Sequence, residues 1–434
     1  EVEPELIVPV DHPEIEAALV VARCRYDQGE DARYFVPLVS TSETAGEGPA
    51  QGIGDALYDQ AFLAWLVGGF GERRSFERDG SWRWRSIGED SLLEAMGSIP
   101  GRVLTGEQSN TSVVFGDVAV VKVFRKLREG INPDLEIGEF LTAHGGFAHA
   151  TRLFGLIDLV REDQPTAIAA VQEFVVNVGD GWEWMLDQLS RLDTESHDRL
   201  VDAVALLGRR TGEMHVALAA DATDEAFAPV PFEDRDARQL NERIVGEIGE
   251  SVEGLARRLE PAEVEAIHKG MGQLMSNAQA LVGSFRIRVH GDYHLGQLLR
   301  TPDDDFTILD FEGEPSRPIP QRRAKHSALK DVAGMLRSLD YAVATVAGRD
   351  PAREGALRAW LADAESAYVD AYRRAASAAP VPLAAEDDVQ FRQGLSLLVA
   401  EKALYEVRYE LNNRPDWLNI PLNALRGLVS REHA

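Results

Sequence analysis

The pattern of apolar and polar positions divides the chain into a strand-rich first part and a helix-rich second part. Between residues 98 and 176, short apolar runs such as TSVVFGD and VAVVKVFRK alternate with turn residues, which predicts strands around a helix at 133–145. After residue 176 the apolar positions recur at intervals of three and four, which predicts helices. The expected helices are 182–221, 234–283, 328–347, 351–376 and 386–412.

Residues 1–97 have a pattern of their own. The runs ELIVPV, ALVVARCRY, DARYFVPLV and SWRWRSI predict strands, and DALYDQAFLAWLVGGF predicts a helix. STSETAGEGPAQG, at 40–52, has the composition of a loop. We therefore expect an α+β protein with an N-terminal cap at 1–97, a small sheet-rich lobe at 98–176 and a large helical lobe at 177–434. Such a pair of lobes is the outline of a bilobal enzyme.

Composition and charge narrow the classes of partner. The 434 residues are 44% apolar and 27% charged, which is ordinary for a globular protein. Lys and Arg number 45 against 72 Asp and Glu, a net charge of −27, which argues against nucleic-acid and anionic-membrane partners. The single cysteine, Cys24, excludes an intrachain disulfide and fits a reducing compartment. With no apolar run of membrane length and no basic-then-apolar signal in EVEPELIVPV, we expect a cytoplasmic protein, monomeric or weakly dimeric.

One short stretch carries most of the candidate chemistry. Residues 289–297 read VHGDYHLGQ, and ILDFEGEP follows shortly afterwards. The two histidines, His290 and His294, allow a zinc site, and a zinc-dependent hydrolase would need a third ligand from the nearby acids and an open coordination position. Hydrogen bonds that shape a loop are the other use of these histidines, since buried polar groups are usually hydrogen-bonded.

Phosphoryl transfer accounts for more of the chain. This reaction needs a carboxylate that orients the acceptor hydroxyl and oxygen ligands for magnesium ions on the nucleotide phosphates. Asp292 is the candidate base, and Gln297 and Asp310 are the candidate metal ligands. Asp331 and Arg337, in the helix pattern LKDVAGMLRS, are expected to brace the catalytic loop rather than to touch substrate.

A phosphotransferase of this kind also predicts a lysine on an upstream strand and a glutamate on the next helix. Lys122 lies in VAVVKVFRK and is expected to grip the ATP phosphates, while Glu136 in PDLEIGEFL is expected to hold the lysine. The polar turn TGEQSNTSVVF precedes them and lacks the G-x-G-x-x-G pattern. Its candidate phosphate contacts are Gln108, Ser109, Asn110 and Ser112.

These motifs resemble a known family. VHGDYHLGQLLR with ILDFEGEP resembles the signature H-G-D-x-H-x-x-N of the aminoglycoside phosphotransferase-like sugar kinases, which have a protein-kinase-like fold. The similarity is greatest with the maltokinase and glucosamine kinase branch of actinobacteria, which has Gln in place of Asn. EQSNTSV, LKDVAGMLRS and NRPDWLNIPL belong to the same resemblance, which covers about 98–434. It implies ATP and Mg²⁺ as cofactors and a hinge at Glu173–Val175 whose backbone pairs with adenine.

The acceptor is expected near EKALYEVRYELNNRPDWLNIPL. The rings of Tyr409 and Trp417 suit sugar faces, and Glu410 offers a carboxylate to hydroxyl or ammonium groups. Glu312 and His294 are further candidate substrate contacts beside the catalytic loop.

Two sugars compete within the resembled branch. Maltokinases convert maltose to maltose 1-phosphate, and glucosamine kinases convert D-glucosamine to glucosamine 6-phosphate. The R-W-F/Y-x-x-K segment with which maltokinases open is absent from residues 1–40, and an acidic acceptor region suits a cationic amino sugar. The sequence therefore favours a glucosamine kinase, with a maltokinase as the alternative.

Overall fold

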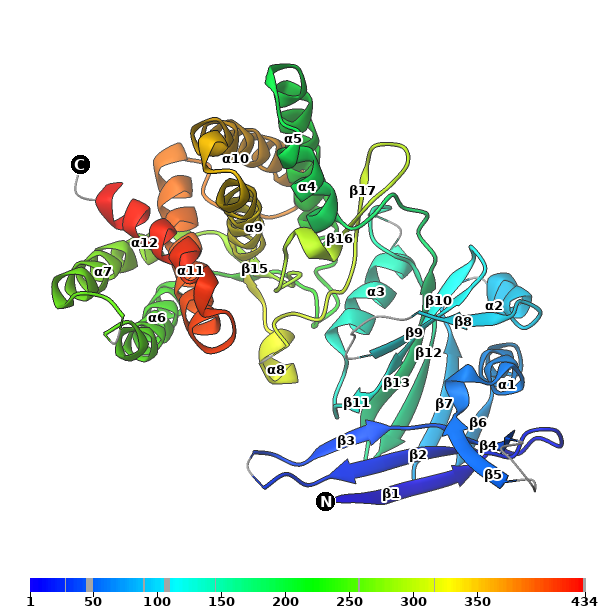
Figure 1. Cartoon of the computed structure of the whole chain (residues 1–434). Helices are drawn as coiled ribbons and strands as arrows, with labels where there is room; N and C mark the ends of the chain where they lie inside the picture. The colour runs from blue at the N-terminus through cyan, green and yellow to red at the C-terminus, as the bar shows by residue number, and fades with distance from the viewer. Residues whose placement is uncertain are drawn as a thin grey trace. The chain divides into compact units, whose positions relative to one another are not determined.

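The chain was examined as a computed structural model, which forms two compact units, Glu1–Val176 and Asn177–Ala434 (Figure 1). The expected change from a strand-rich to a helix-rich pattern coincides with the boundary between them. The structure describes residues 1–27, 29–43, 50–88, 90–104, 110–144, 146–256, 258–315 and 317–431.

Two antiparallel sheets build the first unit. One has the strand order β11-β3-β2-β4-β5, with β1 paired to β2, and the other has the order β6-β7-β12-β13-β10-β9-β8. The strands of the first sheet are β1 (Val2–Pro9), β2 (Ala17–Cys24), β3 (Ala32–Phe35), β4 (Leu38–Glu43), β5 (Ala50–Asp55) and β11 (Lys126–Leu127). Those of the second are β6 (Ser75–Glu77), β7 (Ser81–Ser86), β8 (Gly101–Val103), β9 (Asn110–Phe115), β10 (Ala119–Phe124), β12 (Leu153–Arg161) and β13 (Gln164–Glu173).

Residues 1–97 and 98–176 share one hydrophobic core. Strand β7 pairs with β12, so the second sheet takes strands from both ranges. Helix α1 (Gln60–Gly71) adds Phe62 and Phe70 to a core that also contains Leu6 of β1 and Trp82 of β7. The expected cap is therefore continuous with the sheet that carries Lys122, rather than a separate body. Two more helices, α2 (Asp90–Met96) and α3 (Pro133–His144), complete the elements described in this unit.

The prediction of a loop at 40–52 is wrong for every residue of that range that the structure describes, because 40–43 lie in β4 and 50–52 lie in β5. β4 and β5 pair with each other in an antiparallel register that runs from Leu38 opposite Asp55 to Glu43 opposite Ala50. β4 also pairs with β2. Backbone hydrogen bonds from these neighbours satisfy a segment that is rich in Ser, Thr and Gly and lacks the apolar alternation of a strand. Residues 44–49 of the expected loop lie outside the described residues.

The second unit is mainly helical, as expected (Figure 1). Its longer helices are α4 (Gly181–Ser190), α5 (Thr194–Leu218), α6 (Asp234–Leu255), α7 (Pro261–Leu274), α9 (Leu329–Arg349), α10 (Glu354–Ala376), α11 (Asp388–Asn413) and α12 (Asn419–Arg431). The range expected as one helix at 182–221 is two, because Asp193 caps α5 in a capping box with Ser196. None of the described helices is long and apolar enough to cross a bilayer.

Short strands in the second unit position its catalytic loop. β16 (Leu298–Arg300) pairs with β17 (Phe306–Ile308), and β15 (Phe285–Ile287) pairs with β14 (Val230–Pro231) and β18 (His326–Ser327). The segment 288–297 therefore leaves one small sheet at β15 and enters another at β16. Helix α9 follows β18 directly, which brings its first turn to the loop.

Candidate active site

Lys122 occupies a central strand of the second sheet. It lies on β10, opposite Ser112 of β9 and Ala170 of β13. Its side chain is only 10% exposed, and its Nζ atom lies 3.5 Å from Oδ2 of the buried Asp134. A buried ammonium is costly unless it is paired, so Asp134 makes the burial of Lys122 tolerable.

The sequence singled out Glu136 as the partner of Lys122, and missed Asp134. Both acids lie in the first turn of α3, where Asp134 is buried and Glu136 is half-buried. An acid in the first turn of a helix has an ordinary explanation, because it complements the helix dipole, so the sequence carried no signal that separates the two. A role for Glu136 at Lys122 stays a prediction.

The other expected nucleotide contacts lie along the same sheet. Asn110 begins β9 and Ser112 lies beside Lys122, whereas Gln108 and Ser109 lie outside the described residues. Glu173 ends β13, where its N–H donates to the carbonyl oxygen of Arg152 at 2.9 Å. Val175 is half-buried close after that strand. Adenine pairing at Glu173–Val175 stays a prediction.

A buried carboxylate fixes the start of the catalytic loop. Oδ2 of Asp331 accepts the N–H of His290 at 2.8 Å, and Oδ1 accepts the N–H of Gly291 at 2.9 Å. Nε2 of His215 on α5 lies 3.0 Å from Oδ2. Burial alone would raise the pKa of Asp331, but the hydrogen bond and charge interaction with His215 outweigh it and bring that pKa below its usual range. The expected bracing role of Asp331 is confirmed, whereas Arg337 bonds Glu406 and Asp340 on the helices α11 and α9.

A second set of contacts ties the loop to the ILDFEGEP segment. Nε2 of His290 lies 2.8 Å from the carbonyl oxygen of Leu309, and the N–H of Leu309 donates to the carbonyl oxygen of Gln297 at 2.9 Å. β16 begins directly after Gln297 and β17 ends shortly before Asp310, so the antiparallel pairing of Leu298 with Ile308 brings Gln297 and Asp310 to the same end of this small sheet. Asp310 has φ +56°, a left-handed conformation that Asp tolerates better than most residues and that is common at functional sites.

The two histidines serve as scaffold. One ring nitrogen of His290 bonds the Leu309 carbonyl, and Nδ1 of His294 accepts the N–H of Gly296 at 3.0 Å. Burial lowers the pKa of His294, which favours a neutral ring. Each contact gives its ring a place in the loop, as the loop-shaping interpretation expects. A contact between His294 and substrate stays a prediction.

Asp292 meets a lysine that the sequence analysis did not single out. Nζ of Lys402 on α11 lies 3.3 Å from Oδ1 of Asp292. Burial would lower the pKa of Lys402, but the charges of Asp292, Glu314 and Glu406 raise it above its usual value, so the ammonium remains charged. Lys402 therefore orients the Asp292 carboxylate.

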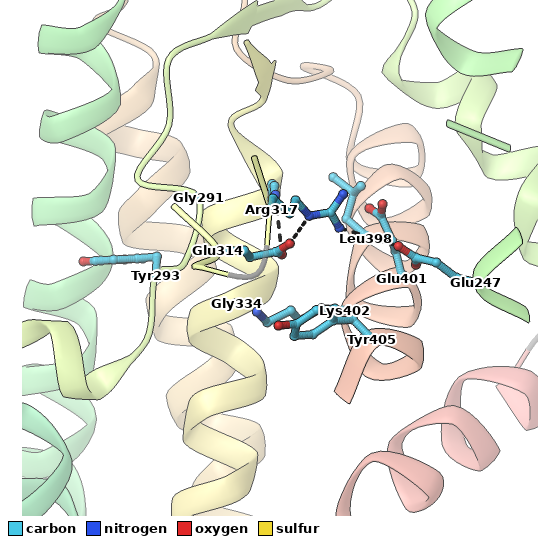
Figure 2. Close-up of a pocket in the computed structure, with 11 residues that line it drawn as sticks. Glu247, Gly291, Tyr293, Glu314, Arg317, Gly334, Leu398, Glu401, Lys402 and Tyr405 are labelled. Atoms are coloured by element: carbon cyan, nitrogen blue, oxygen red, sulfur yellow. Dashed lines mark hydrogen bonds and ion pairs between the residues drawn. The ribbon is translucent and has the colours of Figure 1, made fainter. Parts of the chain in front are cut away.

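A pocket opens beside this pair, within the second unit (Figure 2). Gly291 and Tyr293, which flank Asp292, form part of its wall. The remaining lining residues are Glu247, Glu314, Arg317, Lys330, Gly334, Leu398, Glu401, Lys402 and Tyr405. Glu314 is bonded to Arg317 and lies 3.6 Å from Nζ of Lys330. Although burial opposes it, the charges of Lys330, Lys402 and Arg317 lower the pKa of Glu314 to about 2.

The acceptor residues expected from the sequence do not line this pocket. Glu410 is buried, and it bonds Arg414 at 2.8 Å and the hydroxyl of Tyr341 at 3.1 Å. Trp417 stacks on Tyr341 with ring centroids 6.0 Å apart, and Tyr409 is 43% exposed. These residues support one another in the fold, and their contact with a sugar stays a prediction.

Glu312 follows the candidate metal ligand Asp310 by two residues. Its Oε2 atom lies 3.9 Å from Nη1 of Arg322, and its carbonyl oxygen accepts a bond from the same guanidinium at 2.9 Å. Its role toward substrate or metal stays a prediction.

Replacing Asp331 with alanine is expected to destabilise the second unit. The N–H groups of His290 and Gly291 would be left buried without acceptors, which costs about 2–4 kcal/mol in the free energy of unfolding. Because the folded pKa of Asp331 is lowered, this contribution is present above the unfolded pKa and disappears as the pH falls through the folded value. Denaturant unfolding at neutral and acid pH measures it, with exposed Asp198→Ala on α5 as control. Equal stability of the two variants at neutral pH would show that the bonds from His290 and Gly291 to Asp331 do not stabilise the fold.

Comparisons with known proteins identify relatives of the whole chain. A glucosamine kinase from Streptacidiphilus jiangxiensis is 32% identical over 410 residues, which cover 92% of this chain and 86% of that protein. A glucosamine kinase from Mycolicibacterium smegmatis is 28% identical over 379 residues, covering 81% of this chain and 91% of that protein. No protein-family model matches the chain.

A solved structure extends the similarity to three dimensions. The structure of a glucosamine kinase in complex with glucosamine, ADP and inorganic phosphate matches with a TM-score of 0.74 and 27% identity. The match covers 99% of this chain and 94% of that one. It confirms the expected α+β fold with a helical C-terminal part. The chain belongs to the glucosamine kinase family.

Proposed function

We propose that the chain is an ATP-dependent kinase that transfers the γ-phosphate of ATP to the 6-hydroxyl of D-glucosamine. The observation that carries this proposal is the pairing of Asp292 with Lys402 at the edge of an acid-lined pocket, in a chain 32% identical to a glucosamine kinase. The products are glucosamine 6-phosphate and ADP.

Asp292 acts as the base in this proposal. The acceptor hydroxyl gives its proton to the Asp292 carboxylate as its oxygen forms a bond to the γ-phosphorus, and the bond from that phosphorus to the ADP oxygen breaks. The hydrogen bonds that the N–H groups of His290 and Gly291 donate to Asp331 hold the backbone immediately before Asp292 in place. Lys402 holds the side chain. Positioning of this kind is a large part of phosphoryl-transfer catalysis.

Gln297 and Asp310 fit a magnesium ion. They offer an amide and a carboxylate oxygen, the donor types that Mg²⁺ prefers, and the Leu309–Gln297 backbone bond holds the two segments together. When bound, Mg²⁺ neutralises the phosphate charge that develops during transfer. Lys122, held by Asp134, is the proposed contact to the ATP phosphates.

The proposed reaction is tested by ADP release across a panel of acceptors. Glucosamine is expected to give the highest kcat/KM among glucosamine, glucose, N-acetylglucosamine, maltose and an aminoglycoside. Asp292→Asn tests whether this site carries out the transfer. It should abolish turnover, because the amide cannot accept the hydroxyl proton, while calorimetry should still show ATP binding. A preference for maltose would support the maltokinase alternative, and turnover by Asp292→Asn would refute the assigned base.

Lys402→Met is expected to lower the rate of transfer. Without the ammonium 3.3 Å from its Oδ1 atom, the Asp292 carboxylate loses the contact that orients it, so kcat should fall by about tenfold or more while the KM for ATP changes little. Lys402→Arg should restore part of the rate because it keeps a cationic donor. Exposed Lys269→Met on α7 is the matched control. A folded Lys402→Met enzyme with the wild-type kcat would contradict the orienting role of Lys402.

A further inference from the structure

Glu247 is the pocket carboxylate that the protein leaves least compensated. It projects from α6 and is 8% exposed. Its Oε2 atom is buried and has no hydrogen-bond partner among the residues that the structure describes. Its Oε1 atom lies 3.6 Å from Nη2 of Arg317, which is an ion-pair distance but too long for a hydrogen bond. An acceptor that is buried without a donor is costly, so a ligand that brought a donor to this oxygen would bind more tightly.

The other two acids of the pocket already have partners. Glu314 accepts a bond from Nε of Arg317 and lies near Lys330. Glu401 on α11 accepts bonds from Nε and Nη2 of Arg243 at 3.0 and 2.9 Å. Figure 2 shows the carboxylate of Glu247 turned toward Glu401 and Arg317. Glu247 therefore lies beside a second carboxylate, and Arg317 approaches it only to an ion-pair distance.

The surroundings of Glu247 make its negative charge costly. Burial is the main cause, and the neighbouring charge of Glu401 adds to it. Arg317, Arg243 and Arg408 act in the opposite direction but do not balance these effects, so the pKa of Glu247 is raised to about 7. A cation that entered the pocket would lower the cost of this charge, and a neutral ligand would not.

We propose that Glu247, supported by Glu401, binds the ammonium group of the amino sugar and thereby sets the specificity of the kinase. This inference rests on the proposed function. An ammonium group supplies both the missing donor to Oε2 and a positive charge beside two carboxylates. The hydroxyl at the same position of glucose supplies only a donor. The acetamido group of N-acetylglucosamine is neutral and larger.

If Glu247 sets the specificity in this way, glucosamine binding also changes the protonation of Glu247. Near pH 7 the Glu247 carboxyl is partly protonated, and an ammonium group held against it favours the ionised form. Glucosamine binding should therefore release protons from Glu247, which calorimetry detects as a dependence of the binding heat on the ionisation enthalpy of the buffer. The Glu247 contribution is the difference between the wild-type protein and Glu247→Gln, since proton uptake or release by the sugar amine itself is common to both.

The test compares Glu247→Gln with Glu250→Gln. Glu250 lies on the same helix one turn later, where it pairs with Arg408 and is 61% exposed, so its replacement controls for a general effect on α6. Glu247→Gln keeps the size of the side chain and removes its charge. The ratio of kcat/KM for glucosamine to that for glucose should fall by about tenfold to a hundredfold, the range for loss of a charged hydrogen bond. Glu250→Gln should keep the wild-type ratio, and Glu247→Asp should retain part of it.

The outcomes separate this inference from the proposed function. If the wild-type enzyme does not phosphorylate glucosamine, the proposed function fails and the inference fails with it. If the wild-type enzyme prefers glucosamine but Glu247→Gln keeps the same ratio and the same proton release, only the inference is overturned. Equal losses with both sugars would also overturn it, because they would show a structural role. Thermal unfolding of each variant establishes that the protein measured is folded.

Discussion

The candidate active site depends on the hydrogen bonds that the buried Asp331 carboxylate accepts from two consecutive backbone N–H groups, at His290 and Gly291. A single charged acceptor with both oxygens engaged fixes the path of the backbone more narrowly than one bond would. Asp292 is the next residue, so its side chain leaves a backbone that is already held in place. Because His215 also bonds Asp331, helix α5 takes part in holding a loop with which it shares no sequence neighbourhood.

The three acids that line the pocket differ in how well the fold stabilises their negative charge. Glu314 is stabilised as an anion because neighbouring cations lower its pKa, and Glu401 is paired with Arg243. Glu247 is the acid whose pKa is raised, to about 7, mainly by burial. Lys402 remains charged because acids surround it, and its ammonium group contacts the Asp292 carboxylate directly. Among the described acids that line the pocket, Glu247 thus has a buried oxygen without a hydrogen-bond donor, which is the property expected of a site for a cationic ligand.

The sequence predicted the parts of this site that lie within short motifs. Asp292, Gln297 and Asp310 are close together along the chain, and Lys122 has the clear setting of an alternating strand. The residues that the sequence did not predict as site residues meet only after folding. Glu247, Glu314 and Glu401 come from three distant segments, and each of the two on helices has an ordinary explanation as a solvated helix charge. Aromatic residues such as Trp417 were expected at the acceptor because rings suit sugars, yet the structure stacks this ring on Tyr341.

The most direct test of the central claim is proton–phosphorus correlation NMR of the product formed from ATP and glucosamine by the whole chain. The account predicts one new phosphorus signal, coupled to the two protons on carbon 6 of the sugar, that appears in proportion to ADP. A phosphorus signal coupled to the anomeric proton, or ADP formation without any phosphorylated sugar, would contradict it.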